Sequence, residues 1–268
     1  MFDLEGKIAI ITGGNGVLGG AIAEGLAAQK VKVAILGRTK KTVNAAVEKI
    51  EEQGGTALAL VADVLDKKSL EQAKSKLLKQ WGSLDILVNA AGGNRKGATI
   101  GPEQTFFDLS MDDFSAVTDL NLQGTVLPSF VFGQIMANTK TGSIINISSM
   151  AAQSAITRVV GYSAAKAGVD NFTKWLAVEM AQKYGDGIRV NAIAPGFFVG
   201  DQNRDLLLEP DGSLTARGKT ITTQTPMKRF GKPEELQGVA LWLAGSGASF
   251  VTGNVIPVDG GFSAFSGV

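Results

Sequence analysis

Cysteine and histidine are both absent from the 268 residues of this chain. Without cysteine, disulfide bonds and thiolate chemistry are excluded. Without histidine, the commonest general base, a Ser-His-Asp triad and any histidine-ligated metal site are excluded too, and we expect no bound metal. Acid–base chemistry in this protein must therefore rely on tyrosine, lysine, aspartate or glutamate.

A surplus of charge and long hydrophobic runs are also lacking. The 26 Lys and Arg residues balance 25 Asp and Glu residues, so charge gives no reason to expect nucleic acid or an anionic membrane as a partner. No apolar run approaches the roughly 18 residues needed to cross a bilayer. Residues 1–7 lack the basic start, the apolar stretch and the cleavage site of a secretory signal. We therefore expect a cytoplasmic protein that acts on a small molecule.

Short apolar runs alternate with longer amphipathic stretches along the whole chain. Continuously apolar runs are typical of parallel strands that helices cover on both faces. The alternation therefore predicts an α/β fold, a doubly wound parallel sheet in one domain spanning residues 1–268. The strand-like runs lie at 8–11, 31–36, 57–61, 86–88, 143–147, 188–192 and 254–257, and the helix-like stretches at 18–29, 43–53, 69–80, 112–136, 163–184 and 234–244.

Two long polar segments interrupt this alternation, at residues 92–110 and 196–225. In an open α/β sheet, the loops beyond the carboxyl ends of the strands line the ligand crevice. Long connections inside a compact domain are usually functional or disordered. We interpret both segments as substrate loops, with disorder as the alternative.

The first strand-like run leads directly into a glycine-rich loop and then into a helical pattern. This order lays the pyrophosphate of a dinucleotide on backbone N–H groups at the start of the helix. Tight turns also need glycine, but the position between the first strand and the first helix favours a cofactor site. We expect cofactor contacts from Gly13, Asn15, Gly16, Val17 and Leu18.

The segment after the second strand distinguishes NAD from NADP. A carboxylate there would bind the ribose hydroxyls of NAD, whereas a cation would favour the additional phosphate of NADP. The chain has Arg38 at this point and no acid, and a guanidinium can bind two phosphate oxygens at once. The sequence therefore favours NADP over NAD, with a solvated cation at a helix start as the alternative. After the third strand, Asp63 and Val64 are placed to meet the adenine.

Tyr162 and Lys166 lie four residues apart in the most convincing helical pattern, so both side chains project from one helix face. A phenol with its usual pKa near 10 is a poor base at neutral pH. A nearby ammonium favours the phenolate, so Tyr162 can exchange a proton with a substrate oxygen as hydride moves. Ser149 could hold that oxygen, and Asn121 occupies a mid-helix position where a polar role is plausible. Each residue alone is more often structural; together they form the acid–base set that a chain without histidine requires.

Together these residues resemble the short-chain dehydrogenase/reductase family over essentially the whole chain. Each motif alone is loose, but all of them in order are specific. The resemblance implies a Rossmann-like sheet of about seven strands and a nicotinamide-dependent oxidoreductase. The matching pieces are residues 12–19, Asp63, residues 89–92, Asn121, Ser149, Tyr162, Lys166, Pro195 and Gly196.

The resemblance also implies a role for each member of the catalytic tetrad. Tyr162 would be the acid or base, and Lys166 would lower its pKa and bind the nicotinamide ribose. Ser149 would orient the carbonyl, and Asn121 would hold a water of the proton relay. The further cofactor contacts that it implies come from Asn89, Ala91, Pro195, Gly196 and Phe198.

The chain departs from the family pattern at two positions. The usual middle glycine falls at Val17, and we expect the neighbouring Gly16 to supply the special backbone geometry one position early. Gly200 stands where the family often has a threonine that bonds the carboxamide, so backbone groups of Phe198 or Val199 would have to substitute.

Several further segments are similar to the sugar-acid branch of the family, the D-mannonate oxidoreductases (fructuronate reductases) and gluconate dehydrogenases. Such a substrate needs a cation for its carboxylate, for which Arg158 is our first choice, and amide and hydroxyl groups for its other oxygens. These side chains could instead be solvated loop groups, and the branch often has an acid after the second strand, which conflicts with Arg38. The candidate substrate residues are Asn94, Arg95, Gln153, Arg158 and Asn203, with Lys96, Gln202 and Arg204 nearby in the sequence.

Three functions stay open from the sequence. The leading one is an NADP- or NAD-dependent oxidoreductase of a sugar acid. The second is a reductase of 3-ketoacyl or other ketones, which would expect a more apolar loop than residues 196–225, and the third is a dinucleotide-binding regulator without turnover. The family resemblance also implies a homotetramer built on two long helices and the C-terminal strand.

Overall fold

A seven-stranded parallel sheet organises the molecule, which is described here by a computed structural model covering residues 3–200 and 203–267. The strand order is β3-β2-β1-β4-β5-β6-β7, and every neighbouring pair is parallel. The predicted fold class is therefore confirmed. The strands are β1 (Ile8–Thr12), β2 (Lys32–Gly37), β3 (Thr56–Val61), β4 (Ile86–Asn89), β5 (Gly142–Ile147), β6 (Ile188–Pro195) and β7 (Val255–Val258).

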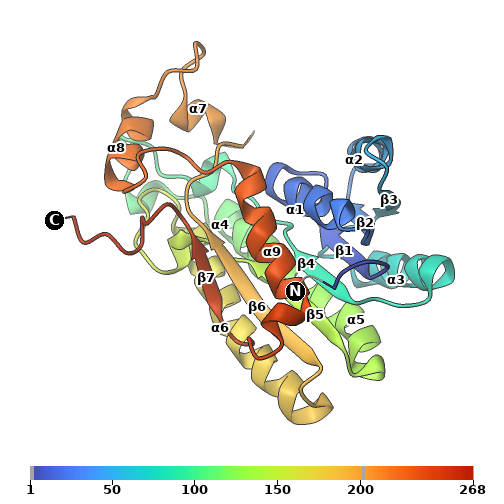
Figure 1. Cartoon of the computed structure of the whole chain (residues 1–268). Helices are drawn as coiled ribbons and strands as arrows, with labels where there is room; N and C mark the ends of the chain where they lie inside the picture. The colour runs from blue at the N-terminus through green and yellow to red at the C-terminus, as the bar shows by residue number, and fades with distance from the viewer. Residues whose placement is uncertain (1–2, 201–202, 268) are drawn as a thin grey trace.

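Helices cover both faces of this sheet (Figure 1). On one face α1 packs with α2 and α9, and on the other α3, α5 and α6 pack side by side, with α4 against α6. The helices are α1 (Val17–Ala28), α2 (Lys40–Glu52), α3 (Lys67–Trp81), α4 (Met111–Thr118), α5 (Gly124–Thr139), α6 (Val160–Tyr184), α7 (Arg204–Leu207), α8 (Ala216–Gln224) and α9 (Gln237–Ala244).

The apolar strands explain this layering. Along β1, Ala9 and Ile11 belong to the core under α1, α2 and α9, whereas Ile8 and Ile10 belong to the core under α3, α5 and α6. Successive strand residues point to opposite faces, so a strand that is apolar at every position builds two cores. Burial on both faces fixes the parallel sheet in place.

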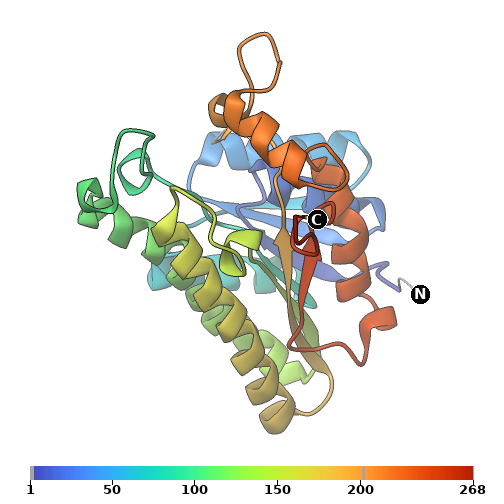
Figure 2. The same ribbon diagram turned by 90° about the vertical axis from the view of Figure 1, so that its left-hand side faces the viewer.

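The sheet reverses its order between β1 and β4, because β2 follows β1 on one side while β4 lies on the other. In open α/β sheets, ligands bind in the crevice beyond the carboxyl ends of the strands at such a point. Figures 1 and 2 both show α7 and α8 lying beyond that edge of the sheet. Across the described residues, no helix combines the length and the apolar character needed to cross a bilayer.

Two sequence predictions about local structure are wrong. The single helix predicted over residues 112–136 is interrupted, because a π-helical turn at Asp119–Gln123 separates α4 from α5. The segment 196–225 was predicted as a loop, but it contains α7 and α8. Short polar helices without a strong apolar stripe escape a periodicity argument, since α8 has only Ile221 as a buried large apolar residue.

Candidate active site

A cleft of about 970 Å³ opens beyond the carboxyl ends of β1 and β4. Its walls come from the glycine loop, the end of β2, the segments after β4, β5 and β6, and the first turn of α6. Of the sequence-predicted site residues, the cleft is lined by Gly13, Asn15, Gly16, Val17, Leu18, Arg38, Val64, Ala91, Asn94, Arg95, Asn121, Ser149, Tyr162, Lys166, Pro195, Gly196, Phe198 and Asn203.

The glycine loop forms the floor of the cleft and fits a dinucleotide phosphate. Gly13 has a φ of +64°, and a Cβ there would lie 2.9 Å from Ala91 N, so no other side chain is accommodated. Helix α1 begins at Val17, its N-cap Gly16 makes no side-chain cap, and its first turn holds no acidic residue. The first backbone N–H groups of α1 are thus free of side-chain caps, and the helix dipole favours an anion there.

The expectation that Gly16 supplies the special backbone geometry is wrong. Gly16 has a φ of −96° and a ψ of 175°, an extended conformation open to any residue. Gly13 has the positive φ instead. A Cβ at Gly16 would lie 3.3 Å from the Gly13 carbonyl oxygen, a tight contact.

The end of β2 carries Arg38, which is exposed and lines the cleft. Gly37 precedes it and packs so closely on Asn15 that a Cβ would collide with the Asn15 side-chain oxygen. The Asn15 amide donates to Thr42 Oγ1 at 2.9 Å, which ties the glycine loop to the start of α2. Arg38 is therefore held beside the glycine loop, where the adenosine half of a dinucleotide would lie.

Two predicted cofactor residues lie outside the cleft lining. Asn89 is buried, and its amide donates to Ser129 Oγ and Asn146 Oδ1, both at 2.9 Å, so it joins β4 to β5 and α5. Asp63 accepts a hydrogen bond from the Leu65 backbone N–H at 3.0 Å, while its neighbour Val64 lines the cleft. Both side chains hold the backbone that forms the cleft wall.

Helix α6 positions Tyr162 and Lys166 together. It begins at Val160, three residues before the predicted start at residue 163, so Tyr162 lies in its first turn. Lys166 is only 4% exposed, and its Nζ donates to the Ile147 carbonyl oxygen at 2.7 Å. The Lys166 Nζ lies 5.6 Å from the centre of the Tyr162 ring, which matches the expected convergence.

Burial dominates the electrostatics of this pair. It lowers the pKa of Lys166 to about 8, opposed by the charge of Asp170 one turn further along α6. It raises the pKa of the Tyr162 phenol, opposed by a hydrogen bond with Ser149. The prediction that the lysine charge lowers the phenol pKa is wrong in direction for this structure. Burial raises that pKa, and the opposing effect comes from Ser149 rather than Lys166, so the phenol keeps its proton at neutral pH.

Asn121 lies in the π-helical turn and is fully buried. Its amide donates to the carbonyl oxygens of Gly93 at 2.7 Å and Val117 at 2.8 Å, and its Oδ1 accepts from the Gly93 N–H at 3.3 Å. A Cβ at Gly92 would lie 2.7 Å from Asn121 Oδ1 and 3.5 Å from Lys166 Nζ. The glycine therefore lets this loop pass between the two side chains. Single π turns are frequent at functional sites.

Sequence reasoning missed a hydrogen-bonded group around Asp170, which lies one turn after Lys166 on α6. The Ser148 hydroxyl donates to Asp170, and Gln153 also bonds that carboxyl. Burial raises the pKa of Asp170, opposed by these hydrogen bonds and by the charges of Lys174 and Lys166. The sequence could have indicated this group through the four-residue spacing from Lys166 to Asp170, which places both residues on one helix face. Gln153, a predicted substrate residue, is exposed and lies outside the cleft lining.

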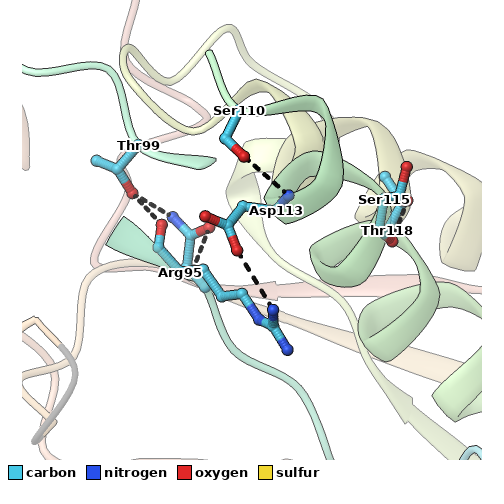
Figure 3. A network of polar contacts seen from close by, with 7 residues as sticks. Arg95, Thr99, Ser110, Asp113, Ser115 and Thr118 are labelled. Carbon is cyan, nitrogen blue, oxygen red and sulfur yellow. Dashed lines mark hydrogen bonds and ion pairs between the residues drawn. The ribbon is translucent and has the colours of Figure 1, made fainter. Parts of the chain in front are cut away.

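The loop after β4 carries two more predicted substrate residues. Arg95 points toward Asp113 on α4, with Nη1 3.3 Å from Oδ1 (Figure 3). The Asn94 amide donates to Thr99 Oγ1 at 2.9 Å, and its Oδ1 accepts from the Arg95 N–H. These bonds order the loop. They also engage the side chains of Asn94 and Arg95, which the sequence analysis assigned to substrate binding.

The opposite wall follows β6. Asn203 donates to the Phe198 carbonyl oxygen at 2.9 Å and accepts from the Gly200 N–H at 2.8 Å, so its side chain bonds the backbone of the segment after β6. The carbonyl of Phe198 is thereby already engaged. Gln202, also predicted near the substrate, lies outside the described residues.

Arg158 is partly buried just before α6 and lies outside the cleft lining, while Arg217 on α8 lines it. Arg217 donates to Thr157 Oγ1 at 3.2 Å and to the Thr157 carbonyl oxygen at 3.3 Å. Burial lowers the pKa of Arg217, and the charge of Arg158 lowers it further. Sequence reasoning missed Arg217, whose only signal was a cation inside the long polar segment.

Known proteins match this chain in sequence and in fold. A short-chain-dehydrogenase-type family model, described as enoyl-(acyl carrier protein) reductase, matches residues 15–263. The chain belongs to the short-chain dehydrogenase/reductase family. It is a nicotinamide-dependent oxidoreductase of that family, as the relatives and solved structures also indicate.

Among curated relatives, the chain is 51% identical to the uncharacterised oxidoreductase UxuB of Bacillus subtilis (strain 168), covering 99% of this chain and 98% of that protein. It is 35% identical to a 3-oxoacyl-[acyl-carrier-protein] reductase of Synechocystis, covering 99% and 100%.

Two solved structures of the family hold a nicotinamide cofactor. A provisionally named D-mannonate oxidoreductase from Haemophilus influenzae, with bound NAD, is 42% identical with a TM-score of 0.93, covering 99% of this chain and 98% of that one. A gluconate 5-dehydrogenase from Burkholderia cenocepacia, in complex with NADP and tartrate, is 30% identical with a TM-score of 0.89, covering 98% of both.

Proposed function

We propose that this enzyme transfers hydride between a nicotinamide cofactor and a sugar acid such as fructuronate, mannonate or a gluconate. One observation carries the proposal: Tyr162, Lys166, Ser149 and Asn121 meet in a cleft whose other end is the glycine loop. The relative named as a D-mannonate oxidoreductase and the gluconate 5-dehydrogenase with tartrate support the substrate class.

The cofactor, when bound, supplies hydride to the substrate carbonyl carbon or accepts it from the alcohol. Tyr162 donates its phenolic proton to the carbonyl oxygen in reduction and removes it in oxidation. Ser149, which hydrogen-bonds the phenol, orients that oxygen. Lys166 lies beside the phenol ring and, in its charged form, stabilises the phenolate that proton donation leaves behind. Asn121 holds the backbone of Gly93 and, we propose, the water that returns the proton.

The glycine loop and the residues around it would hold the cofactor. Val17 and the start of α1 offer backbone N–H groups to the pyrophosphate. The N–H groups of Gly13 and Gly16 already bond the carbonyl oxygens of Leu36 and Gly13, so these glycines shape the loop and leave room for the phosphates. Arg38 would bind the additional phosphate of NADP, so we propose a preference for NADP over NAD. The absence of an acid at the end of β2 supports it, since a carboxylate there would repel that phosphate.

The mouth of the cleft supports a polar, anionic substrate. Arg95, Lys96 and Arg217 line it together with Asn94 and Asn203. Arg158 adjoins Arg217, and we propose that it attracts the substrate carboxylate. Apolar side chains also line this cleft, among them Ile156, Val159, Leu206 and Leu207. The preference for a sugar acid over a 3-ketoacyl substrate, despite the 35% identical reductase, therefore rests on the cations.

We also propose that the chain works as a single domain in a cytoplasmic homotetramer. The exposed apolar side chains of Phe130 on α5 and of Trp175 and Val178 on α6 would form its interface. Light scattering of the purified protein tests this assembly, and a monomer would overturn it.

A panel of keto and hydroxy sugar acids and 3-ketoacyl esters, each with NADPH and NADH, tests the substrate class by nicotinamide absorbance. We expect turnover of a fructuronate, mannonate or gluconate isomer. Turnover of acyl ketones alone would overturn the proposal in favour of a ketoacyl reductase. Cofactor binding without turnover of any substrate would favour a regulator.

A further inference from the structure

Two guanidinium groups lie near each other beside the cleft: Arg217 lines it, and Arg158 lies outside its lining. Arg217 comes from the first turn of α8, and Arg158 from the segment that leads into α6. The Arg217 guanidinium is fixed on Thr157, the residue before Arg158, by bonds of 3.2 and 3.3 Å to its hydroxyl and carbonyl oxygens. The Arg217 guanidinium therefore lies close to the Arg158 segment and within reach of its charge, although 59 positions separate the two residues along the chain.

This arrangement is costly without an anion. Two like charges repel more strongly away from bulk water, and both arginines are partly buried. Among the described residues, the ion pairs include neither Arg158 nor Arg217, whereas Arg95 and Arg229 pair with Asp113 and Glu235. A carboxylate placed between the two guanidiniums would remove the repulsion and accept several charge-assisted hydrogen bonds.

The backbone holds both arginines in position. Arg158 has a φ of +79°, a conformation that residues with a Cβ rarely adopt, and its carbonyl oxygen accepts from the Ile100 N–H at 3.0 Å. Helix α8 is packed on α7, where a Cβ at Gly218 would collide with the Leu207 carbonyl oxygen. Local strain of this kind persists only where the surrounding structure enforces it, and it is concentrated at functional sites.

We propose that Arg217, with the charge of Arg158 near it, forms the carboxylate subsite, and that Arg217 is the residue by which helix α8 selects an acid over its neutral counterpart. This inference rests on the proposed sugar-acid function and adds a residue and a helix to it. Arg217 also joins α8 to Thr157, just before α6. An occupied subsite therefore holds helices α7 and α8 against the first turn of α6, which carries Tyr162.

The test compares Arg217→Met, Arg217→Lys and a control, Lys219→Met, which removes an exposed cation from the same helix. Each protein is assayed with an acid substrate from the panel and with its neutral sugar counterpart. We expect Arg217→Met to lower the ratio of kcat/KM for acid over neutral substrate by about 10- to 100-fold, mainly through KM of the acid. Arg217→Lys should recover part of this ratio, and Lys219→Met should keep it.

A binding measurement separates this inference from the proposed function. The thermal stabilisation of each protein by gluconate and by tartrate is measured with saturating reduced cofactor, which can oxidise neither compound, so binding is followed without turnover. If the wild type turns over no sugar acid, the proposed function fails, but loss of this stabilisation in Arg217→Met alone would still support the subsite. If the wild type turns over sugar acids while Arg217→Met keeps both its ratio and its stabilisation, the subsite is wrong. Equal stabilisation of all the proteins, or none in the wild type, also overturns it.

Discussion

Lys166 and Tyr162 share one face of α6, with the lysine Nζ 5.6 Å from the centre of the phenol ring. Burial moves their pKa values in opposite directions, downward to about 8 for the lysine and upward for the tyrosine. At neutral pH the free enzyme therefore holds a charged lysine beside a protonated phenol. This state is ready to donate a proton, so it favours carbonyl reduction, whereas alcohol oxidation needs the phenolate and gains from higher pH.

The stability of the protein should report the low pKa of Lys166. Folding lowers this pKa from 10.5 to about 8, so the unfolded chain binds the proton more tightly and stability rises as pH increases from 8 toward 10.5. The free energy of unfolding of the wild type, relative to Lys166→Met, should therefore rise by up to about 1.4 kcal/mol per pH unit in this window. Urea unfolding of both proteins at several pH values measures it.

Lys174→Met controls for loss of a lysine charge, because Lys174 is exposed two turns further along α6. Its stability difference from the wild type should stay nearly constant across the same pH values. A pH-independent difference for Lys166→Met would mean that Lys166 titrates as it does in water, and that the lysine is not buried as the structure describes.

Tyr162→Phe should abolish proton transfer while leaving the fold and the cofactor cleft intact. General acid catalysis contributes about 10²- to 10⁴-fold, so kcat should fall by at least that range. Cofactor affinity, measured by calorimetry, should change little, since the glycine loop carries the phosphate contacts. Tyr184→Phe, at the far end of the same helix, is the matched control. Turnover that persists in Tyr162→Phe would remove the tyrosine from its proposed role.

Ser149→Ala should shift the pH dependence of alcohol oxidation. The hydrogen bond with Ser149 lowers the Tyr162 pKa, against the larger effect of burial. Without that bond, the phenol deprotonates at higher pH, so the alkaline rise of kcat/KM should move upward. The pH profile of oxidation in both proteins measures the shift, and an unmoved profile would show that Ser149 only binds substrate.

The sequence predicted the sheet well because the strands are mostly apolar and the turns between several elements are marked by glycine. The run predicted at residues 8–11 corresponds to β1 (Ile8–Thr12), and the run at 86–88 to β4 (Ile86–Asn89). Spacing along one helix also predicted that Tyr162 and Lys166 converge. These inferences depend on local periodicity, which a single sequence contains.

Other features depend on contacts between distant segments, so no local pattern revealed them. The π turn at Asn121 is a change of hydrogen-bond register within an apparently continuous helix. The proximity of Arg217 to Arg158 cannot be predicted without knowing where α8 lies. The direction in which the Tyr162 pKa moves depends on how much protein surrounds the phenol, which the spacing of Tyr162 and Lys166 along the chain does not reveal.

Arg38→Asp should reverse the proposed cofactor preference. The substitution removes a phosphate ligand from the end of β2 and places there a carboxylate that repels the NADP phosphate and accepts the ribose hydroxyls of NAD. Because a hydrogen bond to a charged group is lost, we expect KM for NADPH to rise by about 10- to 100-fold. Steady-state kinetics with both cofactors measures it, with Lys40→Asp on the exposed start of α2 as the control. Equal KM values for NADPH in wild type and Arg38→Asp would show that Arg38 is a solvated cation.

Asn121→Ala should lower stability as well as activity, because the Asn121 side chain bonds the Gly93 backbone in the wall of the cleft. The substitution leaves the Gly93 N–H and the carbonyl oxygens of Gly93 and Val117 without these bonds. An unsatisfied buried polar group costs about 1–3 kcal/mol, so the free energy of unfolding should fall by at least about 2 kcal/mol. Gln123→Ala changes an exposed amide in the same π turn, which bonds only Asp119 among the described residues, and should cost under about 0.5 kcal/mol. The free energy of unfolding of both variants is measured by urea unfolding. If both lose a similar amount, the π turn itself, rather than the hydrogen bonds of Asn121, holds residues 92–93 beside Lys166.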